Sequence, residues 1–235
     1  IFAVLVRQPR SAFWDANVWA VYHAIAAKAA AATFPSEMYK HRRNLYAVLN
    51  VGLAYGKGQR MPACLCQTQY NTLLDRLLSN PAVQCMATFA SATFRLWAPH
   101  LYKHYHKHNT ALHNCLPHLR RNFPRSVFAC ATFNFGPNVW TFRHRDVLNL
   151  PFGWCMIQSS SPFDATKDGH LVLWDLKIAV EFPHGALILV PSAMLSHSNV
   201  PVQPGNECIL FMQFTSGGLM QFVDHRFQTE LELAE

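Results

Sequence analysis

Beyond residue 126 the chain becomes a series of short apolar runs, and this pattern restricts the fold more than any other feature of the sequence. Pro, Gly, Asn and Asp lie between the runs at short intervals. The runs cover residues 127–133, 139–142, 155–157, 170–173, 177–182, 186–190 and 209–214. Short strands with frequent turns predict a β-sandwich or β-barrel for this part of the chain.

The first 125 residues have a different pattern, which predicts helices. Residues 13–33 are rich in Ala and contain neither Gly nor Pro. Residues 68–79 place four leucines on one helical face. Residues 82–119 continue helically, with a break at Ala98-Pro99. We therefore expect a helical layer before the β core.

Two shorter stretches complete the first half. Ser36 is expected to begin a short helix, and the stretch from Gly52 to Gln59 is expected to be a glycine-punctuated loop. The fold class predicted is α+β, a single domain over residues 1–235 with a mainly helical buttress over 1–125 and a β core over 126–223. Because the sequence opens at Ile1 and already looks ordered there, we expect it to be part of a longer chain.

Composition restricts the class of protein. Hydrophobic residues make up 51% of the chain, which is enough for a packed core and argues against general disorder. The net charge of +7 favours polyanionic partners. The seven cysteines form an odd set without a C-x-x-C pair, which indicates reduced thiols inside the cell. No apolar stretch approaches the length of a membrane span, so no membrane partner is expected.

One short motif carries candidate chemistry. His144-Arg145-Asp146 follows an expected strand, where residues two apart point to the same face. His197 follows another expected strand, at 186–190. Two His and one carboxylate on one face form the facial triad of non-haem iron(II) oxygenases. An H-x-D motif also arises by chance, and a lone His in a β core is usually only hydrogen-bonded.

Longer motifs resemble a known family. The second half is similar to the fungal TET/JBP-like dioxygenases that depend on 2-oxoglutarate and iron(II), a group often carried beside transposons. The resemblance begins at the glycine-rich loop from Gly52 and continues nearly to the C-terminus. Its sharpest stretches include Thr132-Phe133-Asn134-Phe135-Gly136-Pro137, Asn149-Leu150-Pro151, Glu181-Phe182-Pro183, Pro191-Ser192-Ala193 and His197-Ser198-Asn199.

The resemblance implies a fold and a metal site. The fold is a double-stranded β-helix, or jelly roll, with helices buttressing one face. His144, Asp146 and His197 are then the ligands of Fe(II), with 2-oxoglutarate as co-substrate. Relatives of this group oxidise methylated DNA bases after flipping them out of the duplex, which implies a DNA partner and a nuclear location.

The resemblance also implies two binding residues. Asn149 matches the position at which TET proteins hold an Asn against the edge of cytosine, although an Asn before Leu-Pro also suits a simple turn. Asn134 lies where a related group of demethylases has an Asn that contacts 2-oxoglutarate. A side-chain amide at the end of a strand can equally form hydrogen bonds with unpaired backbone groups.

One departure from the family concerns the co-substrate. The family usually has an Arg about a dozen residues after the distal His, which grips the far carboxylate of 2-oxoglutarate. Ile209 stands at that position here, and no Lys or Arg occurs between Lys177 and Arg226. Arg143 or His170 are candidates to replace it.

The sequence therefore leaves three functions open. The first is an enzyme that oxidises a methylated base, most simply 5-methylcytosine in DNA, with N6-methyladenine or methylated RNA bases as alternatives. The second is a degenerate copy that binds metal or DNA without turnover, which Ile209 suggests. The third is an oxygenase that acts on a small molecule.

Three clusters of basic residues are interpreted as surface features. The histidines between His100 and His118 are expected to form a solvated, partly cationic helix face, although His104 and His108 have the spacing of a metal pair. His41-Arg42-Arg43 and the arginines from Arg120 to Arg125 are expected to be solvated or to contact phosphates.

Overall fold

The computed structural model describes residues 1–9, 12–56, 59–65, 68–229 and 231–233. Its largest element is a seven-stranded antiparallel sheet with the strand order β1-β11-β8-β13-β6-β4-β5. The strands are β1 (Val4–Val6), β11 (Leu187–Val190), β8 (Cys155–Ser159), β13 (Leu210–Phe214), β6 (Cys130–Phe135), β4 (Ala47–Ala54) and β5 (Ala63–Cys64).

A smaller antiparallel sheet has the order β10-β9-β12-β7. It consists of β10 (Ile178–Val180), β9 (Leu171–Leu173), β12 (His197–Asn199) and β7 (Thr141–His144), with the 3-10 helix η2 (Trp174–Leu176) between β9 and β10. A hairpin of β2 (Lys40–His41) and β3 (Asn44–Leu45) stands beside β7, because the Phe142 amide donates a 2.9 Å hydrogen bond to the Arg43 carbonyl.

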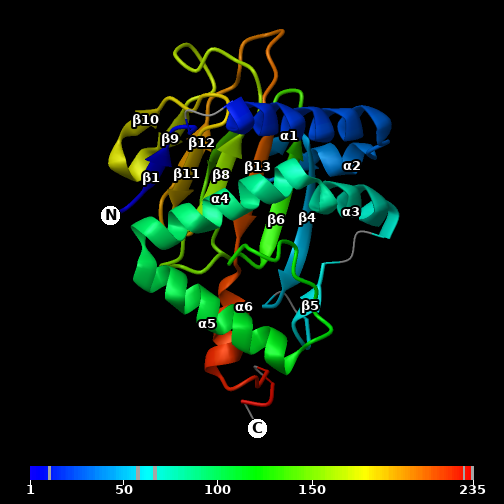
Figure 1. The fold of residues 1–235 in the computed structure, drawn as a ribbon, viewed down its shortest axis with the longest axis vertical. Helices are drawn as coiled ribbons and strands as arrows, with labels where there is room; N and C mark the ends of the chain where they lie inside the picture. The colour runs from blue at the N-terminus through cyan, green and yellow to red at the C-terminus, as the bar shows by residue number, and fades with distance from the viewer. Residues whose placement is uncertain (10–11, 57–58, 66–67, 230, 234–235) are drawn as a thin grey trace.

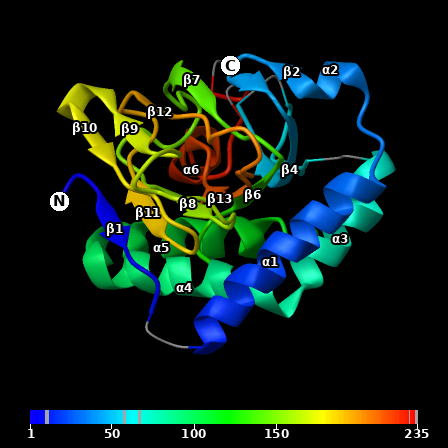
Figure 2. The same ribbon diagram turned by 90° about the horizontal axis from the view of Figure 1, so that it is seen from above.

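The helices are α1 (Ala12–Ala31), α2 (Ser36–Tyr39), η1 (Thr68–Tyr70), α3 (Asn71–Ser79), α4 (Pro81–Trp97), α5 (Pro99–Cys115) and α6 (Gly217–Asp224). The long helices α1, α4 and α5, together with α3, lie on one side of the large sheet (Figures 1 and 2), whereas α2 lies beside β2 and α6 contacts β4 and α5. In Figure 2 the strands close a barrel-like layer on one side, while α1, α3, α4 and α5 lie together on the other. Among the described helices, none has the length and apolarity needed to cross a lipid bilayer.

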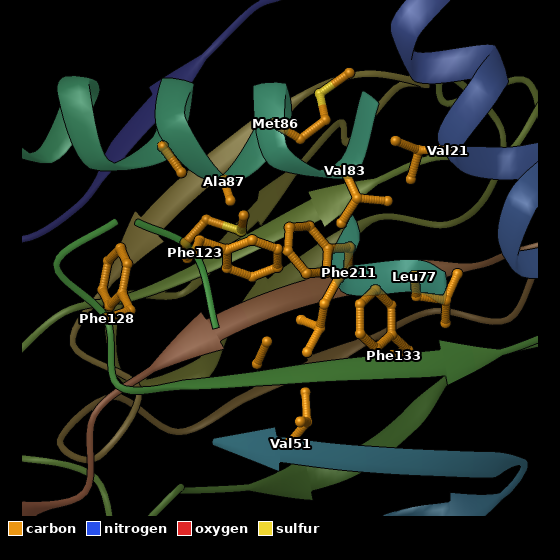
Figure 3. Packing of buried hydrophobic residues seen from close by; sticks show 14 of the residues in the cluster. Val21, Val51, Leu77, Val83, Met86, Ala87, Phe123, Phe128, Phe133 and Phe211 are labelled. Carbon is orange, nitrogen blue, oxygen red and sulfur yellow. The ribbon is translucent and has the colours of Figure 1, made fainter. Parts of the chain in front are cut away.

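The main core lies between the helices and the large sheet. Alternate residues of β6 and β13 face the helices, and the rings of Phe133 and Phe211 stack there with their centroids 5.2 Å apart. Figure 3 shows Val83 and Met86 of α4 above these rings. Burying a side chain of this size stabilises the fold by roughly 1.5–3 kcal/mol, so this layer holds the large sheet rigid.

The opposite face of the same strands points between the two sheets. Thr132 and Asn134 of β6 and Met212 of β13 belong to that face, and a second apolar cluster fills part of the space. Because side chains of a strand alternate between faces, β6 and β13 serve the helical core with one set of residues and the inter-sheet space with the other.

The predicted helices are confirmed, whereas the limits of the β core were too narrow. The strands β1, β4 and β5 come from the first 64 residues, where a helical layer was expected, and they extend the large sheet at both ends. The prediction of a loop from Gly52 was based on its glycines and is wrong at Gly52, which lies inside β4. Lys57 and Gly58 of the expected loop lie outside the described residues.

Gly52 stays in the strand because a neighbouring backbone comes very close to it. Its φ is +122°, and a Cβ built there would lie 2.2 Å from the Ala129 carbonyl oxygen. A side chain at this position therefore meets both backbone strain and a clash with main-chain atoms that have no room to move.

We expect Gly52→Ala to lower the free energy of unfolding by about 3 kcal/mol, from strain plus steric overlap. The matched control is Gly205→Ala, because Gly205 also has a positive φ of +91° but a Cβ there meets nothing within 4 Å. This control should lose only about 1 kcal/mol. Urea unfolding followed by circular dichroism measures both, and equal losses would contradict the close-approach argument.

Candidate metal centre

The three predicted ligands meet at one end of the small sheet. His144 ends β7 and His197 begins β12, and the antiparallel register pairs these two residues directly. Asp146 follows β7, and one candidate ligand atom from each of the three residues lies within 4.8 Å of the other two. The Nε2 atoms of His144 and His197 are 3.8 and 3.9 Å from the carboxylate oxygens of Asp146.

Local hydrogen bonds fix the tautomer of both imidazoles. The Nδ1 of His144 lies 2.8 Å from the Phe142 carbonyl, and the Nδ1 of His197 lies 2.9 Å from the Leu195 carbonyl. A carbonyl only accepts, so each Nδ1 carries the proton and donates it. The Nε2 lone pairs of both rings are therefore free for a metal and point toward Asp146.

Burial sets the charge states at this centre. Burial, followed by the nearby His197, lowers the pKa of His144 to about 4, so the ring is neutral near pH 7. Burial of Asp146 opposes its ionisation, but the charge of Arg43 outweighs burial and holds the pKa of this carboxyl below its usual value. The centre thus combines neutral imidazole with carboxylate, which is the donor set that Fe(II) takes in facial triads.

The residues present fit an iron ion. Two Nε2 atoms and one carboxylate converge from a rigid strand pair, and among the described residues no other group of three His, Cys, Asp or Glu side chains comes together in this way. The Asp146 amide also donates a 2.9 Å hydrogen bond to the Ser192 carbonyl, which fixes the backbone at the carboxylate ligand. Three ligands on one face leave coordination positions open for a co-substrate.

Arg43 belongs to this centre, although the sequence placed it only in a basic surface cluster. Its guanidinium donates a hydrogen bond to Asp146 Oδ1 from the turn of the β2–β3 hairpin. The hairpin is held against β7 through the Arg43 carbonyl and through Asn44, whose side chain donates a 3.0 Å bond to the Trp140 carbonyl. Only the sheet topology reveals this neighbour, because Arg43 is about a hundred residues away along the chain.

A cavity of about 340 Å³ opens beside Asp146, a volume that can hold a small ligand or a nucleobase. Its walls come from the hairpin, the inner faces of β4, β6 and β13, and the segment after Asp146. The residues that line it include His41, Arg42, Arg43, Val48, Leu53, Cys130, Thr132, Leu148, Asn149, Met212 and Phe214.

The structure places Asn149 at this cavity. Its Nδ2 donates a 3.0 Å hydrogen bond to Ser192 Oγ, and its backbone amide donates a 2.8 Å bond to the Asp146 carbonyl. Asn149 therefore lies one turn beyond the carboxylate ligand and keeps a side-chain amide at the cavity wall. Its predicted contact with a base remains a prediction.

Asn134 points between the sheets but does not reach the cavity wall. Its Nδ2 lies 3.5 Å from the sulfur of Met212, which does line the cavity, and its Oδ1 is buried with no hydrogen-bond partner. A buried amide oxygen without a partner is unusual and leaves this residue available for a ligand.

Three residues considered for the co-substrate lie elsewhere. The His170 carbonyl accepts from the Val200 amide, at the end of β9 opposite to the one that pairs with His197. Arg143 is exposed and lies over the Trp174 ring, with its Nε donating to Ser196 Oγ. Ile209 is buried in the helical core, so its side chain does not face the metal.

Ile209 was therefore the wrong position at which to look for a lost cation, because it lies on the helical side of the sheet. The residues of this segment that face the inter-sheet space are Cys208, Leu210, Met212 and Phe214. All four are uncharged. The inner face of β13 therefore lacks an arginine, as inferred from the sequence. The residue that shows this is not Ile209, because Ile209 lies on the other face.

The histidine-rich helix α5 is only partly the solvated face that was expected. His108 is buried, with its Nε2 2.7 Å from Asp224 Oδ1 of α6 and its Nδ1 2.9 Å from the His104 carbonyl. This contact ties α5 to α6. The sequence could not identify it, because Asp224 is distant along the chain and its helix had not been predicted.

Comparison with known proteins finds similar structures but no similar sequence. No protein-family model matches the sequence, and no curated protein matches it either. Among solved structures, NgTET1 in complex with 5mC DNA matches with a TM-score of 0.62 at 12% identity, over 93% of this chain and 73% of that chain. The fold of this chain is therefore similar to that of NgTET1.

Two further similar structures have lower TM-scores. A 2OG-Fe(II) oxygenase family protein from Burkholderia pseudomallei has a TM-score of 0.48 at 15% identity, covering 90% of this chain and 84% of that chain. OsALKBH1 has a TM-score of 0.45 at 10% identity, covering 90% and 95%. The predicted double-stranded β-helix is thus confirmed through NgTET1, whereas membership of the fungal, transposon-associated group stays a prediction.

We expect His197→Ala to weaken Fe(II) binding by roughly a hundredfold or more, because one of three ligands is lost. His170→Ala is the matched control and should change the affinity by less than about threefold, since His170 lies at the far end of the sheet. Anaerobic titration calorimetry measures both affinities. Similar losses in the two variants would contradict the assignment of the triad.

Folding stability should fall as the pH is lowered. Burial is the largest cause of lowered pKa values at His41, His104, His113, His144 and His184. The unfolded chain takes up protons at these residues near pH 6.5, whereas the folded chain does so only at lower pH, so stability is lost from about pH 6.5 downward. Urea midpoints of the metal-free protein between about pH 7.5 and 5.5 test this, and a midpoint that rises on acidification would contradict it.

Proposed function

We propose that this protein is a dioxygenase that uses Fe(II) and 2-oxoglutarate to oxidise a methylated base in nucleic acid, with 5-methylcytosine in DNA as the first candidate. The observation that carries the proposal is the His144–Asp146–His197 triad beside a cavity wall that contains Asn149. The NgTET1-like fold supports the same reading.

Each part of the chain has a defined task in this proposal. Iron(II) held by the triad, together with 2-oxoglutarate and dioxygen, supplies the oxidant that converts a methyl group to a hydroxymethyl group. His144 and His197 present Nε2 to the metal because their Nδ1 atoms are committed to backbone carbonyls. Apolar side chains of the cavity wall, such as Leu148, Met212 and Phe214, keep water away from the reacting methyl group.

Base recognition is assigned to Asn149. A primary amide offers both a donor and an acceptor, which matches the mixed donor and acceptor edge of cytosine. A base must leave the duplex to enter such a cavity, and the net charge of +7 favours the approach of a polyanion. A DNA substrate of this kind also supports our expectation that the protein acts in the nucleus.

A second candidate is a degenerate homologue that binds metal or DNA without turnover. The uncharged inner face of β13 favours it, because a dicarboxylate co-substrate ordinarily meets a cation there. The two candidates differ only in turnover, so a product assay separates them.

The iron-loaded protein, supplied with 2-oxoglutarate, air and a duplex containing 5-methylcytosine, should form oxidised cytosine that mass spectrometry detects. The His197→Ala control should form none above background. Asn149→Ala should lower the rate by about tenfold while leaving Fe(II) affinity unchanged, because a lost base hydrogen bond costs roughly 1–2 kcal/mol. Folded, iron-loaded protein that yields no product on several methylated bases would support the degenerate homologue instead.

A further inference from the structure

We infer that the site selects its 2-oxo acid by the carboxylate that chelates the metal and by an apolar tail, without a requirement for a second carboxylate. This inference rests on the proposed function and concerns the co-substrate of that same site. Neutral 2-oxo acids should therefore serve as well as 2-oxoglutarate.

The first step concerns the end of the co-substrate nearest the metal. A 2-oxo acid chelates through its oxo group and the adjacent carboxylate, so this carboxylate lies in the same coordination sphere as Asp146. Two neighbouring carboxylates repel unless a cation lies between them. Arg43 already contacts Asp146 Oδ1 and lines the cavity, so its planar guanidinium is placed to bind both groups.

The second step concerns the strand wall of the cavity. This wall is formed by alternate residues of β4, β6 and β13, which are the apolar Val48, Cys130, Met212 and Phe214 and the neutral polar Asn50 and Thr132. None of these side chains is cationic. A carboxylate buried against such a wall loses its hydration without gaining an opposite charge, whereas a hydrocarbon tail gains by burial.

The third step concerns the cations that do line the cavity. Among the described residues these are Arg42 and Arg43, neighbours in the turn of the β2–β3 hairpin on the Asp146 side. Arg42 is exposed, so water screens its attraction for a carboxylate. His41 also lines the cavity, and burial keeps this ring neutral. The cationic side chains of the cavity thus come from the hairpin and not from the strand wall.

The chemistry does not depend on the tail. The 2-oxo acid loses its first carboxyl group as CO2 and becomes the next shorter carboxylic acid, taking one atom of dioxygen. The methyl group takes the other atom, and each of the two substrates gives up two electrons. No bond in the tail forms or breaks, so a neutral tail leaves the reaction balanced.

The test compares 2-oxoglutarate with 4-methyl-2-oxopentanoate, which has a branched apolar tail. Calorimetry on the protein loaded with Mn(II), as a stand-in that does not react, measures binding separately from turnover. We expect the neutral acid to bind within about tenfold of 2-oxoglutarate, or more tightly. Arg43→Ala should weaken both acids by at least about tenfold, since both present the chelating carboxylate.

Arg145→Ala is the matched control. Arg145 is next to both Asp146 and His144 in sequence, but its side chain is exposed, pairs with Asp175 at 3.2 Å and does not line the cavity. It should change neither affinity by more than about threefold. An equal loss in Arg145→Ala and Arg43→Ala would overturn the role of Arg43.

Two results would overturn the inference while leaving the proposed function intact. One is binding of 2-oxoglutarate more than about tenfold tighter than the neutral acid. The other is an Arg42→Ala variant that loses affinity for 2-oxoglutarate alone, since Arg42 would then hold the second carboxylate. If neither acid bound to the manganese-loaded protein, the proposed function itself would fail.

Discussion

The pairing of β12 with β7 is the interaction on which the rest of the site depends. It sets His197 opposite His144, and the turn after β7 then brings Asp146 to within 4 Å of both imidazoles. A one-residue slip in this register would turn one histidine to the other face of the sheet and remove the site. The hydrogen bonds from both Nδ1 atoms come from within the same two segments, so the register also fixes the tautomers.

The large sheet makes this arrangement rigid in a way that the small sheet alone cannot. Its outer face is covered by α1, α3 and α4, and the stacked Phe133 and Phe211 belong to that layer. The inner face carries Thr132, Asn134 and Met212 toward the space between the sheets. Each strand has one face that packs against the helices and one that faces the space between the sheets. Ile209 lies on the helical side, so its identity does not show whether a cation faces the co-substrate.

Charge is distributed unevenly around the metal centre. Asp146 is buried and depends on Arg43 to remain ionised. The arginine comes from a hairpin that packs on β7 through backbone hydrogen bonds, not from the β core itself. The cation and the carboxylate therefore come from segments about a hundred residues apart in the chain, which makes the hairpin part of the candidate metal centre.

The sequence by itself determined the helices of the first half, most of the strands after residue 126 and the three candidate ligands, because local periodicity and a short motif carry that information. It misplaced the strand that contains Gly52, because a glycine fits either a loop or a strand beside a close backbone. Only the tertiary structure decided the place of Arg43, the burial of His108 against Asp224 and the orientation of Ile209. Each of these depends on contacts between residues far apart in the chain, and local patterns hold no information about which distant segments will meet.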